Sequence, residues 1–347
     1  PGLGIARNLP RAQPLSEGKL KKISVLGCGR WGSFIAWYLC GRGYDVCSWG
    51  PAGGESYEVL KRTGRNEYVE LDRRILLTCD LEEAVTRAET IVVSISSQGL
   101  REFVKKILAF DVSDKDFVLC MKGIEVGTGN RLSEILVQSG IAPERVAVWV
   151  GPGHIQAFTQ GIPNCMVIDS ASETLKKRLA DGFRSDLIRF YYGSDLIGTE
   201  IGAAAKNVVG IVAGVLDGCG YGALKGALMA RGAREVARLI RAMGGNELSA
   251  YGLAHLGDYE ATLFSEYSHN RKYGEMLVKG EKFGKLAEGV PTAAAMKALG
   301  EKYGVELPIT EAVYDLCYRE TEEDCRERCL KLLARLFARD TKSEFYV

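Results

Sequence analysis

A lysine and an asparagine stand in an unusual place in the middle of the chain. Lys206 and Asn207 directly follow Ala203-Ala204-Ala205, in a segment of small and apolar residues that is predicted to be helical. Burying an ammonium group is costly unless it is paired, and a buried lysine is well suited to proton transfer. The sequence therefore makes Lys206 a candidate acid or base, although a lysine that lies along a helix face to reach solvent would look the same.

Two later segments could supply partners for such a lysine and for a substrate. If Gly252–Thr262 is helical, Asp258 and Thr262 share one face, and Asp258 could hold the buried ammonium. The segment Ser268–Lys272 is polar and basic, which suits a phosphate or carboxylate group, although a solvated helix start has the same composition.

A glycine pattern near the start of the chain predicts a dinucleotide site. The segment Gly27–Gly32 reads GCGRWG, directly after the apolar strand Ile23–Leu26 and directly before a predicted helix. In this context the first glycine permits a tight turn, the second lets a pyrophosphate approach the backbone, and the third allows close packing of helix on strand. The N-terminus of the helix then faces the phosphates. A glycine-rich turn without a ligand is the weaker alternative.

Two more candidates directly follow predicted strands. Lys122 comes after one strand, and Gly151–His154 comes after another, with backbone amides that could contact an anion. In an open α/β sheet the carboxyl ends of the strands line the binding crevice, so both segments are expected near a ligand. The preference between NAD and NADP stays open, because Trp49-Gly50-Pro51 carries neither the acid nor the arginine that would decide it.

The elements that must position these residues fall into two halves. The first half alternates short apolar runs with amphipathic stretches, which predicts an α/β fold with a doubly wound, mostly parallel sheet of the Rossmann type. The predicted strands are Ile23–Leu26, Asp45–Trp49, Thr90–Ile95, Asp116–Met121, Arg145–Val150, Cys165–Ile168 and Ile188–Tyr192. The predicted helices of this half are Gly32–Cys40, Leu81–Thr86, Gln98–Leu108, Arg131–Gln138 and Ala171–Asp181.

After residue 193 the sequence indicates helices alone, beginning with a long one over Ile197–Leu216. We therefore expect an N-terminal tail over residues 1–20 and a dinucleotide-binding domain over 21–193. An all-helical substrate and catalytic domain is expected over 194–340, followed by a C-terminal tail over 341–347. The functional site is expected between the two domains.

Composition excludes several classes of function. The chain has 347 residues with 45 Lys and Arg against 44 Asp and Glu, so no broad electrostatic grip on nucleic acid or anionic lipid is expected. The ten cysteines are scattered and the three histidines are not spaced as metal ligands, which indicates free thiols in a reducing compartment and no metal site. With no signal peptide evident in Pro1–Lys22 and the longest apolar run, Val208–Leu216, too short to span a bilayer, we expect a cytoplasmic protein without membrane insertion.

Taken in order, these segments resemble the NAD(P)-dependent glycerol-3-phosphate dehydrogenases, and the bacterial type in particular. The likeness runs from about residue 22 to about residue 338 and includes GCGRWG, MKGIE, GTEIGAAAKNVVGIVAG, GLAHLGDYEAT and SHNRKYG. It implies a reversible reduction of dihydroxyacetone phosphate to sn-glycerol 3-phosphate, a precursor of glycerophospholipids. It also implies NAD or NADP as cofactor, a small phosphorylated substrate and a homodimer.

The resemblance implies a role for each candidate residue. Lys206 is the implied proton donor in reduction and acceptor in oxidation, with Lys122 near the carbonyl and Asp258 orienting Lys206. The implied substrate-binding residues are Lys122, Gly151, Gly153, Asn207, Asp258, Thr262, Ser268, His269, Asn270 and Arg271. The implied cofactor-binding residues are Gly27, Gly29, Arg30, Trp31, Gly32, Lys122, Ile155, His269, Leu286 and Glu288.

The sequence departs from the family pattern at several of these places, which marks it as a divergent member. His269 stands where the family has an arginine, His255 where it has a glycine, and Gly153-His154 where it has a hydroxyl residue followed by phenylalanine. Two alternatives follow. The first is a related dehydrogenase that acts on another phosphorylated ketose or polyol, or on a hydroxyacid; the second is a catalytically weak dinucleotide-binding sensor.

Overall fold

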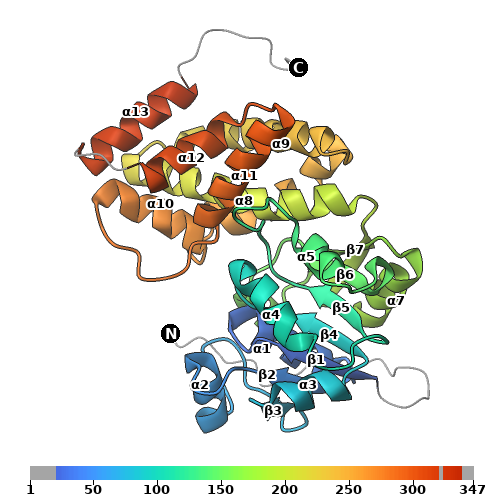
Figure 1. The fold of residues 1–347 in the computed structure, drawn as a ribbon. Coiled ribbons are helices and arrows are strands. Elements are labelled where there is room, and N and C mark those ends of the chain that lie inside the picture. The colour runs from blue at the N-terminus through green and yellow to red at the C-terminus, as the bar shows by residue number, and fades with distance from the viewer. Residues whose placement is uncertain (1–20, 320–322, 338–347) are drawn as a thin grey trace. The chain divides into compact units, whose positions relative to one another are not determined.

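The computed structural model describes residues 21–319 and 323–337, so the tails expected at residues 1–20 and 341–347 lie outside the described residues. Contacts within the chain divide it into two units, and Figure 1 labels the helices and strands of each. Unit 1 comprises the residues up to Lys122 together with Asn130–Glu200, and unit 2 comprises Gly123–Gly129 and the residues from Ile201 onward. The chain therefore passes from one unit to the other at three points.

Unit 1 is built on one eight-stranded sheet with the strand order β3-β2-β1-β4-β5-β6-β7-β8. Neighbouring strands are parallel except for β6 and β7, which are antiparallel. The strands are β1 (Lys22–Leu26), β2 (Asp45–Trp49), β3 (Leu76–Thr78), β4 (Thr90–Val93), β5 (Asp116–Leu119), β6 (Val146–Val150), β7 (Asn164–Ser170) and β8 (Ile188–Tyr192). The predicted mostly parallel sheet is thus confirmed, and its edge strand β3 is an addition.

Helices cover both faces of the sheet, and the strand residues alternate between two hydrophobic clusters. Val92 packs in a cluster that includes Phe34 of one helix and Leu179 of another, whereas its neighbours Ile91 and Val93 pack in the second cluster. The helices of the first face are α1 (Arg30–Gly41) and α7 (Glu173–Phe183), and those of the second are α3 (Leu81–Arg87), α4 (Leu100–Ile107) and α5 (Leu132–Gln138). Successive strand residues thus point to opposite faces of a sheet that has helices on both sides. This is the Rossmann-type arrangement that the sequence predicts.

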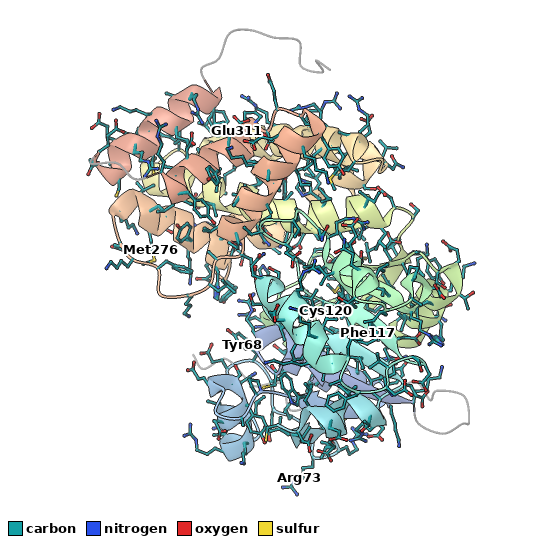
Figure 2. All side chains as sticks on the ribbon, in the orientation of Figure 1. Tyr68, Arg73, Phe117, Cys120, Met276 and Glu311 are labelled. Carbon is teal, nitrogen blue, oxygen red and sulfur yellow. The ribbon has the colours of Figure 1, made fainter. Side chains whose placement is uncertain are left out.

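Two helices of unit 1 were not predicted from the sequence, α2 (Glu55–Thr63) and α6 (Ile155–Thr159). In α2 only Tyr57 and Leu60 are buried, so its apolar pattern is too sparse to mark a helix. Figure 2 shows the contrast between interior and surface in this unit, because Phe117 of β5 is enclosed whereas Arg73 points outward.

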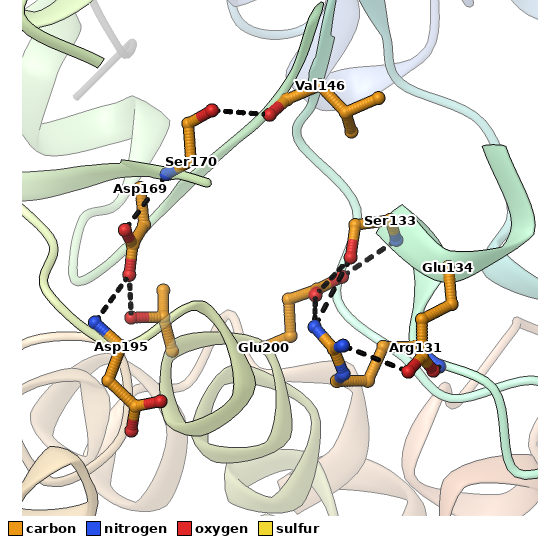
Figure 3. A network of polar contacts seen from close by, with 9 residues as sticks. Arg131, Ser133, Glu134, Val146, Asp169, Ser170, Asp195 and Glu200 are labelled. Carbon is orange, nitrogen blue, oxygen red and sulfur yellow. Dashed lines mark hydrogen bonds and ion pairs between the residues drawn. The ribbon is translucent and has the colours of Figure 1, made fainter. Parts of the chain in front are cut away.

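A polar network fixes the end of unit 1 where the chain leaves it (Figure 3). The buried Glu200 carboxylate accepts hydrogen bonds from Ser133 N at 2.9 Å and Ser133 Oγ at 2.6 Å, and pairs with Arg131 at 2.6 Å. Nearby, Asp169 accepts from Thr199 Oγ1 at 2.8 Å. Burial raises the pKa of Glu200, which the Arg131 guanidinium opposes. The first turn of the following helix is therefore held by the sheet unit.

Unit 2 is helical among its described residues. Its helices are α8 (Leu196–Cys219, which begins in unit 1), α9 (Lys225–Ala242), α10 (His269–Lys279), α11 (Gly289–Tyr303), α12 (Pro308–Tyr318) and α13 (Cys325–Phe337). Between α9 and α10 lie the 3₁₀ turns η4 (Glu247–Tyr251) and η5 (Leu256–Asp258) and the π-helical turn η6 (Glu260–Phe264). The segment around Asp258, for which a helix was considered, is thus a succession of short turns, and Thr262 Oγ1 still donates to Asp258 O at 2.7 Å.

Helix α8 packs directly against the backbone of α10. A Cβ added at Gly214 would lie 1.9 Å from Arg271 O, and one added at Gly274 would lie 2.0 Å from Ile211 O, so only glycine permits this approach. By length and composition α8 could also cross a membrane, which the shorter apolar run Val208–Leu216 did not suggest, but 89% of its apolar window is buried inside the structure. That burial agrees with its place as the central helix of unit 2.

Candidate active site

The glycine turn of unit 1 has the shape that a pyrophosphate requires. Gly27 has φ +112°, and a Cβ there would lie 2.1 Å from Ser94 O, while a Cβ on Gly32 would lie 1.6 Å from Gly27 O. A Cβ on Gly29 would meet nothing within 4 Å, so open space lies beside the backbone at the start of α1. Gly29 caps that helix without a side-chain hydrogen bond, which leaves the first amides of α1 for an anion.

The other predicted residues of the turn lie beside this open space. Arg30 opens α1 and its guanidinium stands 6.0 Å from the Tyr68 ring, whereas Trp31 packs edge-on against Phe34 at 5.4 Å. The residues present thus fit a dinucleotide, with a cation at the helix start and a packed aromatic side chain next to it in the sequence.

The carboxyl ends of β5 and β6 bring a second group of predicted residues together. Lys122 Nζ donates a hydrogen bond to Gly151 O at 3.1 Å, which joins the loops that follow these adjacent parallel strands. Gly153 packs against the Phe158 ring, where a Cβ would approach to 2.4 Å, and Ile155 is buried in the core of unit 1. Lys122 therefore lies at the strand edge expected for a binding crevice, while Ile155 serves the hydrophobic core.

In unit 2, Lys206 is buried with its expected partner Asp258 and, in addition, with Thr262. Lys206 is 8% exposed and Asp258 is 1% exposed. Lys206 Nζ lies 3.0 Å from Asp258 Oδ2 and donates to Thr262 Oγ1 at 2.6 Å, while the Thr262 hydroxyl also contacts Asp258 O at 2.7 Å. The ammonium is thus held by a charge and a hydroxyl in a site with little water, where its interactions are stronger than at the surface.

Asn207, next to this lysine, belongs to a chain of amide contacts. Asn270 Nδ2 donates to Asn207 Oδ1 at 3.0 Å, and Gly289 N donates to Asn270 Oδ1 at 2.9 Å. Asn207 uses its oxygen here, so its amide NH₂ is the group that can donate to a substrate oxygen. The same contacts place the N-terminus of α11, which directly follows Glu288, beside Asn207.

The remaining residues of the predicted phosphate cluster have internal partners as well. Ser268 caps α10, with its Oγ accepting from Arg271 N at 3.3 Å. Arg271 Nε pairs with Asp217 at 2.5 Å, and the same carboxylate holds Lys225 at 2.7 Å. Asp217 and Lys225 were not predicted as site residues, because nothing in the local sequence shows that Asp217 and Arg271, 54 residues apart, meet. His269 Nδ1 lies 3.3 Å from Leu286 O, so two of the three predicted cofactor residues of this unit adjoin each other.

His255 is buried beside the lysine site. It is 0% exposed, with Nδ1 2.8 Å from Gly202 O and Nε2 2.8 Å from the Tyr259 hydroxyl. Burial lowers the pKa of His255 to about 4, and the nearby Lys206 charge acts in the same direction. The sequence marked His255 only as a departure, and Tyr259 was missed because its role depends on that histidine.

This lowered pKa makes a prediction about stability. Between pH 6.5 and pH 4 the unfolded chain binds a proton at His255, whereas the folded chain does not, because the pKa of His255 is lower in the folded state. Acid therefore favours unfolding. His255 should therefore remove about 3 kcal/mol of unfolding free energy as the pH falls from 7 to 4. The measurement is denaturant unfolding at both pH values for the unchanged chain and the non-titrating variant His255→Asn. The gap between the two proteins should shift by that amount, and a gap independent of pH would contradict the assignment.

A doubly wound sheet, an open glycine turn at the start of α1 and a buried lysine–carboxylate pair are together the features of a dinucleotide-dependent dehydrogenase. Family models for the N-terminus and the C-terminus of NAD-dependent glycerol-3-phosphate dehydrogenase match residues 22–176 and 195–325. The chain belongs to the NAD-dependent glycerol-3-phosphate dehydrogenase family and is an NAD(P)-dependent oxidoreductase.

Individual relatives agree with this membership. A glycerol-3-phosphate dehydrogenase [NAD(P)+] from Pelodictyon phaeoclathratiforme is 33% identical over 335 residues, covering 93% of this chain and 99% of the relative. One from Moorella thermoacetica is 36% identical over 311 residues, covering 86% and 92%. The crystal structure of glycerol-3-phosphate dehydrogenase from Coxiella burnetii superposes with a TM-score of 0.82 at 25% identity, covering 90% of this chain and 99% of that one.

Proposed function

We propose that Lys206 donates the proton when this enzyme reduces dihydroxyacetone phosphate to sn-glycerol 3-phosphate, and accepts it in the reverse reaction. When bound, NAD(P)H would supply the hydride for the carbonyl carbon. As that carbon is reduced, negative charge develops on the carbonyl oxygen, and a buried ammonium stabilises it and then transfers a proton to it. The observation that carries this proposal is the contact of the buried Lys206 with both Asp258 and Thr262.

The partners of Lys206 suit both halves of that task. Asp258 keeps the amine charged before the proton moves, and its carboxylate fixes the direction of the Cε–Nζ bond. Thr262 accepts from the ammonium and donates to a backbone carbonyl, so it holds the amine without competing for its proton. We propose that Asp258 and Thr262 also border the substrate, next to the amide NH₂ of Asn207.

We propose that the substrate phosphate is bound by Ser268, His269, Asn270 and Arg271. For the carbonyl end of the substrate we propose Lys122, and for backbone contacts with the substrate Gly151 and Gly153. The support in unit 2 is the start of α10, where helix amides and a basic cluster occur together. Firm binding of the phosphate would position the carbonyl for the reaction, since binding energy at a remote group can orient the reacting one.

For the cofactor we propose binding of the pyrophosphate at Gly27, Gly29 and Gly32 with Arg30 and Trp31. The proposed cofactor-binding residues also include Lys122, Ile155, His269, Leu286 and Glu288. The end of β2 carries neither the acid nor the arginine that would select one cofactor, and the first acid after it is Glu55 at the start of α2. We therefore propose NAD or NADP as the cofactor.

The resemblance also supports finer proposals on setting. We propose a cytoplasmic homodimer that acts on a small phosphorylated substrate, binds no nucleic acid, does not insert stably into a membrane, and supplies a glycerophospholipid precursor. We also propose that the dinucleotide-binding domain comprises residues 21–193 and the substrate domain residues 194–340. The test of the catalytic proposal is steady-state reduction of dihydroxyacetone phosphate, with NADH and with NADPH, by the unchanged chain and by Lys206→Met.

The histidine at position 269 gives a prediction on substrate affinity. The variant His269→Arg should lower KM for dihydroxyacetone phosphate by about fivefold, since a permanent charge near the phosphate adds up to about 1 kcal/mol at a partly exposed site. His269→Gln is the control, because it keeps a polar side chain without adding a charge. An arginine variant with unchanged or higher KM would indicate that the phosphate binds elsewhere or that the preferred substrate differs.

A further inference from the structure

His255 lies between the helix that carries Lys206 and the turns that carry its partners. On one side its Nδ1 contacts Gly202 O of α8, which lies four residues, or about one helical turn, before Lys206. On the other side its own carbonyl accepts from Asp258 N at 3.0 Å as η5 begins. One residue therefore joins the backbone of the lysine helix to the backbone of the carboxylate segment.

The partners of the two ring nitrogens determine the tautomer. A carbonyl oxygen can only accept, so Nδ1 carries the hydrogen and donates to Gly202 O. Nε2 is then the acceptor for the Tyr259 hydroxyl. The ring is neutral in this arrangement, in agreement with its complete burial. Both polar atoms of the imidazole are used for attachment, and neither remains to act on a substrate.

Close packing on both sides makes this attachment rigid. A Cβ at Gly202 would lie 2.9 Å from His255 Cβ, and a Cβ at Gly232 would lie 2.9 Å from the Tyr259 hydroxyl. The His255 and Tyr259 rings meet edge to face with centroids 4.8 Å apart. The histidine and tyrosine thus fill the space between α8 and α9 where each helix has a glycine.

We propose that His255 is a positioning residue for Lys206. By fixing the η5–η6 turns to α8, it sets where Asp258 and Thr262 stand relative to the ammonium. The proposal rests on the proposed role of Lys206 in proton transfer. A general acid works only in a narrow range of distance and direction, so a small movement of its partners lowers kcat more than it lowers substrate binding. The charged and titratable groups near this ring are Lys206, Asp258, Tyr259 and, beside Tyr259, Glu235.

The experiment compares variants that remove or keep the bond to Gly202. The double variant His255→Leu with Tyr259→Phe removes both polar partners and leaves no buried hydroxyl without its acceptor, which protects folding. His255→Asn retains a donor at the position of Nδ1. Val236→Ala, in the buried face of α9, is the control for a general loss of core stability. Each is assayed for kcat, for KM of dihydroxyacetone phosphate, for the pH dependence of kcat and for thermal unfolding.

We expect the double variant to lose about tenfold to a hundredfold in kcat, with a smaller change in KM and a shifted pH dependence of kcat. His255→Asn should recover most of the lost kcat, and Val236→Ala should lower stability while leaving the pH dependence in place. A double variant with the kcat and pH dependence of the unchanged chain would overturn the proposal, as would a His255→Asn variant as slow as the double one. Failure of the lysine role itself would appear separately, as normal turnover by Lys206→Met.

Discussion

Replacing Lys206 by methionine is expected to reduce kcat for dihydroxyacetone phosphate by about 10³-fold, because the reaction loses both its proton donor and the charge that stabilises the developing oxyanion. KM should change less, since the phosphate is proposed to bind at the start of α10. The measurement is oxidation of NADH at saturating substrate across a range of pH. Retention of NADH binding by the variant would show that the loss lies in the chemical step.

The methionine variant also leaves Asp258 without its cation in a buried place, which should cost about 3 kcal/mol of unfolding free energy. A matched control is needed for that cost. Lys176 of α7 is 3% exposed and lies 3.9 Å from the buried Asp169, in unit 1 and outside the proposed site. Lys176→Met should therefore lose stability while keeping kcat within a small factor of the unchanged chain. If both variants lose activity alike, the effect is one of folding and Lys206 has no special role.

The second large effect is expected in the glycine turn, where two alanine variants should fail for different reasons. Gly29→Ala should fold with unchanged stability, because Gly29 has φ −69° and its added Cβ would meet nothing within 4 Å. It should nevertheless weaken NADH binding by at least about tenfold, since the methyl group occupies the space proposed for the pyrophosphate. Fluorescence titration with NADH and thermal unfolding measure the two properties.

Gly32→Ala should show the opposite order of effects. Its Cβ would lie 1.6 Å from the backbone oxygen of Gly27, so the turn must open and the variant should lose about 3 kcal/mol or more of unfolding free energy. Weaker NADH binding would follow from the damaged turn. Unimpaired binding of NADH by a stable Gly29→Ala variant would show that the pyrophosphate does not use this space.

The strands could be predicted from the sequence wherever their own residues form a continuous apolar run. The central strands β1, β4 and β5 are short, mostly buried apolar runs, and they occur where those runs lie in the sequence. Strand β3 has three residues, of which Leu76 and Leu77 are only partly buried, so it has no comparable pattern. The π-helical turn η6 could not be inferred either, because the same periodicity is compatible with an ordinary helix until tertiary contacts select between them.

For the site, the sequence identified side chains but not all of their partners. The pairing of Lys206 with Asp258 could be inferred, because a buried ammonium requires a carboxylate and the segment GLAHLGDYEAT offers one. The engagement of Arg271 by Asp217 could not, since it depends on how α8 and α10 pack. The neutral state of His255 could not be predicted either, because it depends on contacts with the Gly202 carbonyl of α8 and with the Tyr259 hydroxyl.

The chain crosses between the units three times, and this limits how the two units can be exchanged between related proteins by recombination. Residues Gly123–Gly129 belong to unit 2, where a Cβ on Gly129 would lie 2.8 Å from the Leu299 side chain, yet they are encoded in the middle of unit 1. On the return, Arg131 joins Glu200, the last residue before the final passage. A recombination event with one breakpoint after Glu200 would therefore combine a foreign 123–129 segment with the native surface around Leu299. Exchange of cofactor and substrate halves between relatives thus requires coordinated change in a heptapeptide far from the breakpoint.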